Sequence, residues 1–350
     1  MFHHPEYDDH ERVIFARDAD AGLSVIVAIH DTTLGPAFGG CRMWPYADDA
    51  AALIDVLRLS RSMTYKAAIC DLPLGGGKSV IIGDPRTQKT AALLRAVGRL
   101  VESLNGQYII ADDVGTTLDD LAEIQQETRH TAARTDQSRQ PLAVTAFGVF
   151  SAMQAAVRQV MRADLKGLTV AVQGLGNVGF PLCEFLHQHD ARLVVADLDH
   201  QRVAAAVRQF GAKAVVADEI YQQDADIFAP CAFGSVLNDA TVPRLRAKMV
   251  CGGANNQLAE PRHASMLAQR HITYIPDYLA NAGGVIDYHH EGIDDSPRAV
   301  MAAVARIAAI TTDILTRAAE GGHTPLEIAD RMVVDRLAAC RAALAASKVV

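Results

Sequence analysis

The sequence predicts an α/β fold of two domains with a cleft between them, the second domain being a doubly wound parallel sheet of the Rossmann type. The chain has 350 residues, half of them hydrophobic, which is enough for two separate cores. A polar stretch at 131–141 interrupts the apolar pattern and is read as a linker. After it, short β-branched runs alternate with helical segments, a pattern typical of parallel sheets covered by helices.

The first half is expected to hold strands and amphipathic helices in turn. The β-branched and aromatic runs predict strands, and the apolar spacing after a capping Asp or Thr predicts helices. A helix cap before residue 118 could come from Thr117 or from Asp113. The expected elements are strands at 13–15, 23–29 and 108–111 and helices at 48–63, 87–104 and 118–127.

Three consecutive glycines, Gly75–Gly77, stand directly before Lys78 and Ser79. The end of this stretch looks like a phosphate-binding P-loop, which would need a glycine at residue 72 and a helix after the lysine. Residue 72 is leucine, and the run at 80–82 predicts a strand. We therefore expect a glycine loop with φ > 0 that presents Lys78 for catalysis or substrate binding.

A second glycine motif, Gly174-Leu175-Gly176-Asn177-Val178-Gly179, has the form G-x-G-x-x-G. A predicted strand at 168–173 precedes it, a predicted helix at 180–189 follows, and a further strand at 193–196 ends on Asp197. This order supports a dinucleotide site, because glycines let a pyrophosphate reach the backbone at the N-terminus of a helix. A carboxylate at Asp197 accepts hydrogen bonds from ribose hydroxyls and repels a 2′-phosphate, so NAD is favoured over NADP.

The alternation continues to the end of the second half. Ligands bind at the carboxyl ends of parallel strands, and those ends carry glycines and side-chain amides at 230–232, 252–256 and 281–284. Strands are expected near 214–216, 226–229, 249–251 and 272–275, and helices at 144–161, 297–320 and 326–346.

Composition argues against several other classes of protein. The net charge is −8 and no basic run stands out, which disfavours nucleic-acid binding. We find no apolar run long enough for a membrane span and no signal peptide at the N-terminus, so a cytoplasmic protein is expected. The six cysteines include no C-x-x-C pair and the histidines lack ligand spacing, which predicts reduced thiols and no metal.

The domains are placed at 1–135 for substrate binding and catalysis and at 140–330 for NAD binding, with a C-terminal helix at 331–350 packing back toward the first domain. The first domain carries Lys66, Lys78 and Asp113. Two lysines and one acid suit the oxidation of an anionic substrate, because one ammonium can pair with a carboxylate while the other acts as a base.

The chain resembles the Glu/Leu/Phe/Val amino-acid dehydrogenase family, and within it the leucine dehydrogenase branch. The resemblance rests on motifs that keep the family's order over nearly the whole chain. These are the stretches at 31–36, 63–66, 75–78, 112–117, 174–179, 254–257, 276–278 and 281–284.

The resemblance implies reversible NAD-dependent oxidative deamination of an L-amino acid to a 2-oxo acid and ammonia, by a homo-oligomer (a dimer or larger). Lys66 would hold the substrate carboxylate, Lys78 would activate water, and Asp113 would move protons. The other implied substrate contacts are Phe38, Gly39, Gly40, Ala111, Val285 and Asn256. The implied cofactor contacts are Gly174, Leu175, Gly176, Asn177, Val178, Gly179, Asp197, Leu198, Thr145, Cys231, Ala232, Asn255 and Arg42.

The implied side-chain pocket is apolar, which favours leucine, valine or isoleucine and disfavours glutamate. Phe38, Leu142-Ala143 and Asp287 depart from the pattern of leucine-specific relatives. These departures leave the preferred amino acid open, and the same reaction on phenylalanine or tryptophan is the alternative. A nicotinamide-binding protein without turnover is a rival from another class, and the presence of Lys66, Lys78 and Asp113 argues against it.

Overall fold

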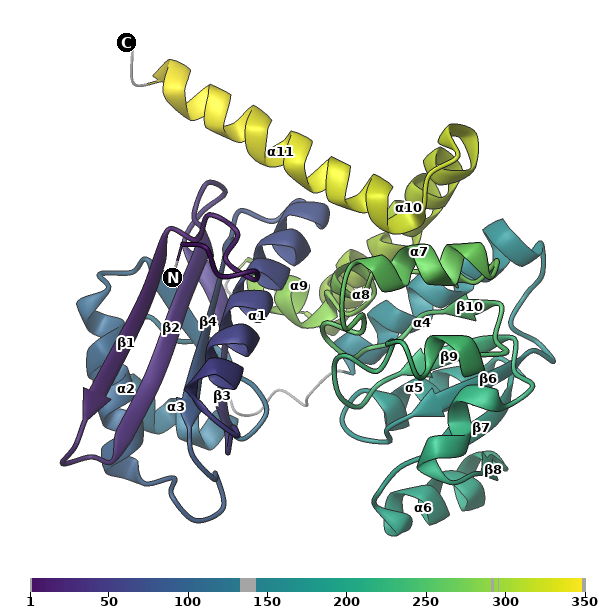
Figure 1. Ribbon diagram of the computed structural model, residues 1–350, viewed down its shortest axis with the longest axis horizontal. Helices are drawn as coiled ribbons and strands as arrows, with labels where there is room; N and C mark the ends of the chain where they lie inside the picture. The colour runs from purple at the N-terminus through teal and green to yellow at the C-terminus, as the bar shows by residue number, and fades with distance from the viewer. Residues whose placement is uncertain (1, 133–142, 291–292, 295, 348–350) are drawn as a thin grey trace. The chain divides into compact units, whose positions relative to one another are not determined.

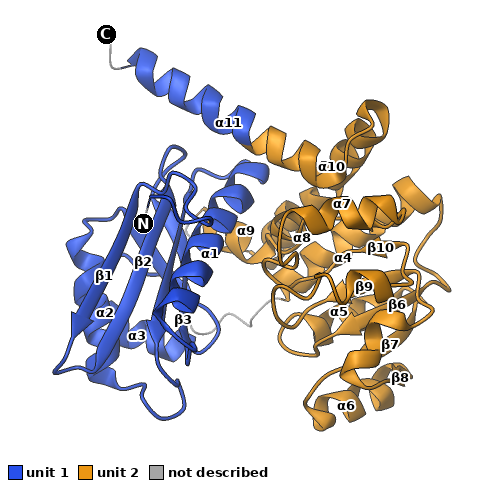
Figure 2. Cartoon of the chain, viewed as in Figure 1, with its two compact units in different colours: residues 1–140, 334–350 blue, residues 141–333 orange. Residues whose placement is uncertain are grey.

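The structure (Figure 1) is a computed structural model that describes residues 2–132, 143–290, 293–294 and 296–347. The chain divides into two compact units, residues 1–140 with 334–350 and residues 141–333 (Figure 2). The polar stretch at 131–141 and the departure at Leu142 fall largely or wholly outside the described residues. The predicted boundaries at 135, 140 and 330 therefore stay predictions.

The first unit is built on a mixed five-stranded sheet with the order β1-β2-β4-β3-β5. Strand β2 runs antiparallel to β1 and β4, whereas β3 runs parallel to β4 and β5. The strands are β1 (Arg12–Asp18), β2 (Leu23–Asp31), β3 (Ala37–Trp44), β4 (Gly75–Ile82) and β5 (Tyr108–Asp112).

Alternation along β2 explains how helices cover both faces of this sheet. Val25, Val27 and Ile29 belong to a core with α2 (Ala91–Ser103) and α3 (Leu118–Gln125). Ile26 and Ala28 belong to a separate core with α1 (Asp49–Ile69). Because successive strand residues point to opposite faces, one apolar strand supplies both cores.

The predicted ends of these helices are partly right. Thr117 caps α3 in a capping box with Asp120, so Asp113 is not the cap. Asp48 caps α1 as expected, accepting a hydrogen bond from the backbone N–H of Ala51. The expected end of α1 near residue 63 is wrong, since the helix continues to Ile69 and carries Lys66 on its last turn.

The glycine loop predicted at 75–77 is wrong, because these glycines form the first half of β4, in the middle of the sheet. None of the three has a positive φ. A Cβ on Gly76 would lie 2.1 Å from Thr64 Oγ1, and one on Gly77 would lie 2.7 Å from the Tyr108 ring. The glycines serve close packing on both faces of a buried strand rather than a turn.

The second unit contains the predicted doubly wound parallel sheet, with the strand order β11-β10-β9-β6-β7-β8. The first strand in sequence lies at the centre and the order reverses there, as in dinucleotide-binding folds. The strands are β6 (Thr169–Gln173), β7 (Arg192–Ala196), β8 (Lys213–Ala214), β9 (Ile227–Pro230), β10 (Met249–Val250) and β11 (Thr273–Tyr274).

Helices connect these strands, and two long ones close the chain. The long helix expected at 144–161 is α4 (Val144–Ala156) followed by a π-helical turn to Met161. The last helix, α11 (Pro325–Ser347), begins in the second unit and its residues from Val334 belong to the first. The others are α5 (Gly179–Gln188), α6 (His200–Phe210), α7 (Arg262–Gln269), α8 (Asp277–Ala280), α9 (Gly283–His290) and α10 (Pro297–Gly321).

Among the described residues, α10 has the length and hydropathy of a membrane span. The expectation that no apolar run reaches the length of a membrane span is therefore wrong, since α10 meets the criteria of length and mean hydropathy. Runs of alanine raise the mean hydropathy, whereas Val304, Ile307 and Ile314 are buried and the helix packs along α4 inside the second unit. A third of this apolar window is buried inside the structure, and one such helix is weak evidence for a membrane span.

Candidate active site

Lys78 and Asp113 form an ion pair in the first unit, with Lys78 Nζ 2.6 Å from Asp113 Oδ2. Lys78 comes from β4 and Asp113 directly follows β5, so β3 lies between them in the sheet. The pair passes over Gly40 of β3. A Cβ there would lie 2.7 Å from Asp113 Cβ and 3.0 Å from Lys78 Nζ. A side chain at residue 40 would therefore occupy the space in which the pair forms.

The two groups of this pair are largely removed from water. The side chains of Lys78 and Asp113 are 5% and 15% exposed. Burial by itself would raise the pKa of Asp113, but the Lys78 ammonium and the Arg42 guanidinium outweigh burial and hold that pKa well below its usual range. Thr116 fixes the backbone here, since its Oγ1 accepts from the Asp113 N–H and donates to the Cys41 carbonyl.

Arg42, predicted to contact the cofactor, lies beside this pair. Its Nε donates to Asp113 Oδ2 at 3.2 Å and its Nη1 donates to Asp55 Oδ2 at 2.8 Å. The Tyr46 hydroxyl donates to the same Asp55 oxygen at 2.6 Å. Sequence reasoning did not single out Asp55 or Tyr46, because neither belongs to a recognisable motif.

The other predicted substrate residues of the first unit lie on the same elements. Lys66 is buried on the last turn of α1. Phe38 is buried on β3, opposite Gly76 of β4 and Ile109 of β5, and Ala111 lies opposite Gly40. The Gly39 carbonyl accepts from the Tyr108 hydroxyl at 2.8 Å.

The glycine motif after β6 has the geometry that a dinucleotide needs. Gly174 has φ +90°, which makes the tight turn. Gly179 opens α5, and a Cβ there would lie 1.8 Å from the Gly174 carbonyl oxygen. Around Gly176 the nearest atom to an added Cβ is Arg202 Nη1, at 3.5 Å. Turn, close packing and an accessible backbone are the three uses of glycine in this motif.

Asp197 follows β7 and reaches back to the glycine motif. Its Oδ2 accepts a 2.5 Å hydrogen bond from the Leu175 N–H, and its Oδ1 accepts from the Asp199 N–H at 2.7 Å. Leu198 beside it is 80% exposed. The residues therefore fit an adenosine ribose, with a carboxylate for its hydroxyls and an apolar side chain next to it.

Ala232 and Cys231 lie near the same turn, at the end of β9, whereas Thr145 lies in the first turn of α4. Added Cβ atoms on Gly174 and Gly179 would meet Ala232 at 2.8 Å and Cys231 at 3.2 Å. Thr145 lies near the start of α9, where its Oγ1 is 3.4 Å from a Cβ added to Gly284. The predicted substrate residues Val285 and Asn256 also belong to this unit.

Asn281 and Gln257 hold the loop that carries Asn255. Asn281 Nδ2 donates to Asn255 Oδ1 at 2.9 Å, and Gln257 Nε2 donates to the Gly252 carbonyl at 2.8 Å. Both side chains are buried, and Asn281 Oδ1 and Gln257 Oε1 have no hydrogen-bond partner among the described residues. Both lie in motifs noted in the sequence, but they were not predicted as site residues.

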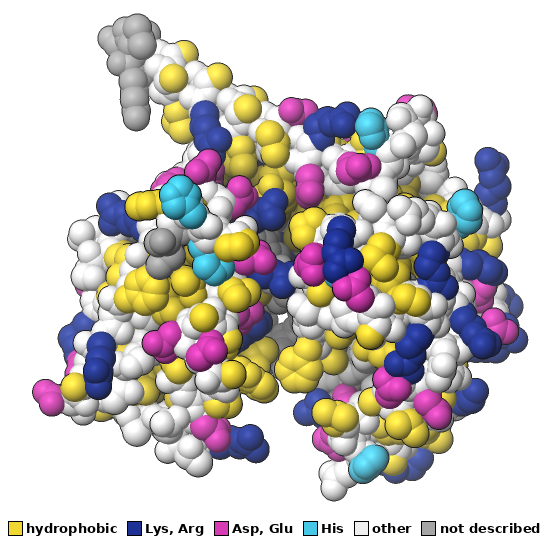
Figure 3. Space-filling view, viewed as in Figure 1, with side chains coloured by type: hydrophobic (Ala, Val, Ile, Leu, Met, Phe, Trp, Pro, Cys, Tyr) yellow, Lys and Arg dark blue, Asp and Glu magenta, His cyan; other side chains and the backbone are white. Residues whose placement is uncertain are grey.

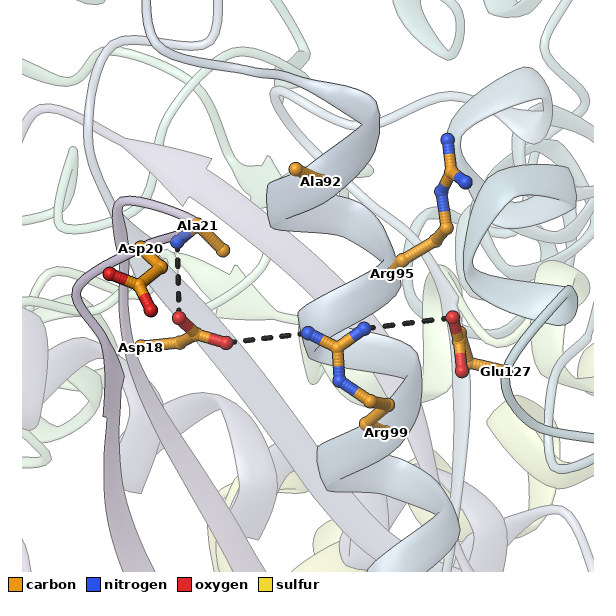
Figure 4. Close-up of a pocket in the computed structure, with 7 residues that line it drawn as sticks. All are labelled: Asp18, Asp20, Ala21, Ala92, Arg95, Arg99 and Glu127. Carbon is orange, nitrogen blue, oxygen red and sulfur yellow. Dashed lines mark hydrogen bonds and ion pairs between the residues drawn. The ribbon is translucent and has the colours of Figure 1, made fainter.

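A surface hollow in the first unit lies apart from this chemistry (Figure 4). Arg99 spans it, with Nη2 3.3 Å from Asp18 Oδ2 and Nη1 3.6 Å from Glu127 Oε1. The lining residues include none of the predicted site residues, so we do not assign the hollow to the active site. They are Asp18, Asp20, Ala21, Ala92, Arg95, Arg99 and Glu127.

Comparison with known protein families accounts for both units. Residues 10–130 match "Glu/Leu/Phe/Val dehydrogenase, dimerisation domain", and residues 138–203 and 195–338 match "Glutamate/Leucine/Phenylalanine/Valine dehydrogenase". The resemblance inferred from the sequence motifs is thereby confirmed.

Individual relatives cover nearly the whole chain. A leucine dehydrogenase of Geobacillus stearothermophilus is 46% identical over 98% of this chain and 95% of its own. An L-tryptophan dehydrogenase of Nostoc punctiforme is 47% identical over 94% of this chain and 93% of its own. The crystal structure of L-tryptophan dehydrogenase from Nostoc punctiforme aligns with a TM-score of 0.78 and 45% identity over 95% of this chain and 97% of that one. The chain therefore belongs to the Glu/Leu/Phe/Val dehydrogenase family and is an amino-acid dehydrogenase.

Proposed function

We propose that this chain catalyses the reversible, NAD-dependent oxidative deamination of an apolar L-amino acid to the 2-oxo acid and ammonia, with leucine, valine and isoleucine preferred. The observation that carries the proposal is the buried Lys78–Asp113 pair, 2.6 Å between Nζ and Oδ2. An amine and a carboxylate in contact, shielded from water, can take up and pass on protons at a substrate amine. Family membership supports the same reaction.

The roles of the chain's own side chains follow from their places. Lys66 pairs with the substrate carboxylate. The pair in the structure is an ammonium and a carboxylate, so Lys78 must lose its proton before it acts as a base. The neutral Nζ then takes a proton from the substrate amine or from the attacking water, and the Asp113 carboxylate stabilises the ammonium that forms. Bound NAD⁺ supplies the hydride acceptor. We propose that the glycine turn at 174–179 and Asp197 hold that cofactor at its pyrophosphate and adenosine ribose.

Preference for an apolar side chain follows from the proposed lining. In the first unit, Phe38, Gly39, Gly40 and Ala111 offer apolar groups and backbone. Val285 and Asn256 belong to the second unit, and their contact with the substrate stays a prediction from the sequence. A second substrate carboxylate, as in glutamate, would need a cation besides Lys66 and Lys78, which have other roles in the proposed reaction, and burying it unpaired is costly. The relatives named leucine dehydrogenase support this preference.

Phenylalanine or tryptophan is the second candidate substrate class. The observation in its favour is the buried Phe38 ring, which could pack against an aromatic side chain. The tryptophan dehydrogenase relative supports it as well. A nicotinamide-binding protein without turnover is disfavoured, because a site that had lost its activity would be free to lose Lys66, Lys78 and Asp113, and all three are present.

A panel of amino acids tests the proposal. NADH formation at alkaline pH is followed with leucine, isoleucine, valine, phenylalanine, tryptophan and glutamate, and kcat/KM is compared. We expect the branched aliphatic substrates to give the highest values and glutamate to give none above background. Higher kcat/KM for phenylalanine or tryptophan than for leucine would establish the second candidate, and no NADH with any amino acid would refute the reaction.

The setting of the enzyme is proposed from the same features. We propose a cytoplasmic homo-oligomer, a dimer or larger, because residues 10–130 match a dimerisation domain and the cysteines are expected to be reduced. On the visible face of the molecule, Lys and Arg are interspersed with Asp and Glu (Figure 3). Such a surface supports a small-molecule enzyme rather than a nucleic-acid or membrane-binding protein.

A further inference from the structure

We propose that Asp55 is a positioning residue for the Lys78–Asp113 pair, acting through Arg42. In this arrangement Asp55 draws the Arg42 guanidinium away from Asp113, so that the Asp113 carboxylate remains available to Lys78. The proposal rests on the proposed function and adds to it the control of proton transfer. All the residues involved belong to the first unit.

The contacts form one continuous chain. The Tyr46 hydroxyl and Arg42 Nη1 both donate to Asp55 Oδ2, at 2.6 Å and 2.8 Å. Arg42 Nε and Lys78 Nζ both form ion pairs with Asp113 Oδ2, at 3.2 Å and 2.6 Å. Arg42 is therefore shared between two carboxylates, and a single oxygen of Asp113 is shared between two cations.

The fold explains why Arg42 is directed toward Asp55. Its neighbours on β3, Cys41 and Met43, lie in the core beneath α2 and α3. Because side chains alternate along a strand, Arg42 points to the opposite face, which α1 covers. Asp55 lies on the second turn of α1. Helix position and strand alternation together place the carboxylate against the guanidinium.

Burial strengthens the electrostatic interactions of Arg42 with its two carboxylate partners. The Arg42 side chain is 18% exposed and that of Asp55 is 25% exposed, so their charges are screened less than surface charges are. Burial acts to lower the pKa of Arg42, but the Asp113 and Asp55 carboxylates outweigh it and keep the guanidinium protonated. Burial and the Asp55 carboxylate raise the pKa of Tyr46, which therefore stays a hydrogen-bond donor.

Two further titratable groups, Cys41 and Tyr108, lie within electrostatic range of Asp113. Burial raises the pKa of Cys41 to about 11 and that of Tyr108 well above its usual value. Both therefore remain uncharged in the working range of the enzyme. Among the residues that the structure describes, the charged groups in contact with Asp113 are Lys78 from β4 and Arg42 from β3.

Two substitutions are expected to move the acid limb of the kcat profile in opposite directions. In Asp55→Asn, the buried Arg42 has Asp113 as its remaining carboxylate partner and pairs with it more strongly. The Asp113 carboxylate then stabilises the Lys78 ammonium less. The acid limb should move to lower pH by roughly 0.5–1 unit. In Arg42→Met, Asp113 is left to Lys78 alone, and the limb should move to higher pH by a similar amount.

The experiment measures kcat and both KM values for leucine and NAD⁺ across pH in the full-length protein. Asp49→Asn is the matched control, because it removes the same charge from an exposed position on the same helix. We expect no shift in Asp49→Asn. Asp55→Asn should lose about tenfold in kcat, with both KM values within about twofold. Arg42→Lys keeps a cation but cannot span two carboxylates, so the acid limb of its kcat–pH profile should lie between those of the wild type and Arg42→Met. Arg42→Lys also replaces Arg42→Met in the comparison if Arg42→Met fails to fold.

A second readout does not need turnover. The rate at which cyanate carbamylates Lys78 is measured at fixed pH by peptide mass spectrometry, and only the unprotonated amine reacts. We expect a faster carbamylation rate in Asp55→Asn and a slower one in Arg42→Met.

Carbamylation rates or acid limbs that shift in the same direction in both variants, or in neither, would overturn the positioning role. A raised KM for NAD⁺ in Arg42→Met without a pH shift would overturn it too and assign Arg42 to the cofactor. Absence of NADH formation in the unmodified chain would refute the proposed function, while the carbamylation comparison would still decide this one.

Discussion

The carboxylate of Asp197 and the backbone N–H of Leu175 are joined by a 2.5 Å hydrogen bond that ties the end of β7 to the glycine turn after β6. Asp197 therefore has two uses in one place. Its hydrogen bond holds the glycine turn, and in the proposed NAD site its charge would face the adenosine ribose while a pyrophosphate approached that turn.

Cofactor preference should depend on the charge at Asp197. We expect the unmodified enzyme to prefer NAD⁺ over NADP⁺ strongly in kcat/KM, because a 2′-phosphate would meet a carboxylate. Asp197→Ala should lower the ratio of kcat/KM for NAD⁺ to kcat/KM for NADP⁺ without reversing the preference. Asp197→Asn is the control, since it removes the charge and keeps an acceptor for the Leu175 N–H. Equal kcat/KM for both cofactors in the unmodified enzyme would contradict the assignment.

Lys78 should be needed for turnover and not for cofactor binding. We expect Lys78→Ala to lower kcat by about 10²–10⁴-fold, while NADH binding, measured by fluorescence titration, stays within about twofold. Lys66→Ala should act mainly on the KM for the amino acid, because a lost carboxylate partner weakens both ground and transition states. Lys166→Ala, an exposed lysine paired with Asp190, is the control. Near wild-type turnover in Lys78→Ala would rule out its catalytic role.

Phe38 should set the size limit of the side-chain pocket. Its ring is buried on β3, next to Gly39 and Gly40. We expect Phe38→Ala to raise the kcat/KM ratio of phenylalanine over leucine, because the space left by the ring admits a larger substrate. Phe15→Ala, at an exposed phenylalanine on β1, should leave the ratio unchanged. An unchanged ratio in Phe38→Ala would place the specificity pocket elsewhere.

Gly76 should tolerate no side chain. A Cβ there would lie 2.1 Å from Thr64 Oγ1 and 2.2 Å from the Thr64 nitrogen, so α1 would have to move off the sheet. We expect Gly76→Ala to destabilise the protein by about 3 kcal/mol or more, or to prevent folding. Gly284→Ala, whose Cβ would meet only Thr145 Oγ1 at 3.4 Å, is the matched control in thermal unfolding. Equal Tm values for the two variants would show that the packing at Gly76 is not restrictive.

The buried His10 should make stability fall in mild acid. Burial, with a smaller effect of His30, lowers the pKa of His10 to about 4. Between the usual value near 6.5 and about 4, the unfolded chain binds a proton here that the folded chain does not, so stability falls as pH falls through this window. His10→Gln should flatten the dependence of the unfolding free energy on pH there, and exposed His3→Gln should not. Parallel curves for His10→Gln and the unmodified protein would contradict this reading.

The sequence by itself determined the second unit well. The strand, the glycine motif, the following helix and Asp197 are consecutive or nearly so, and their geometry follows from local rules for turns and helix starts. The doubly wound parallel sheet was predicted as well, whereas the strand order with β6 at its centre came from the structure, because the connection rules restrict the crossovers without fixing that order. The family could also be identified from the sequence, because its motifs are short and occur in order.

Tertiary structure alone decided how the first unit assembles its chemistry. The three glycines before Lys78 have the local signature of a loop, yet they form a central strand, because neighbouring atoms of Thr64 and Tyr108 lie where side chains would be. No sequence pattern connects Asp55 to Arg42, or Arg42 to Asp113. Those contacts exist because β3 lies between β4 and β5 while α1 covers one face, and strand order in a mixed sheet is set by long-range packing rather than by local sequence.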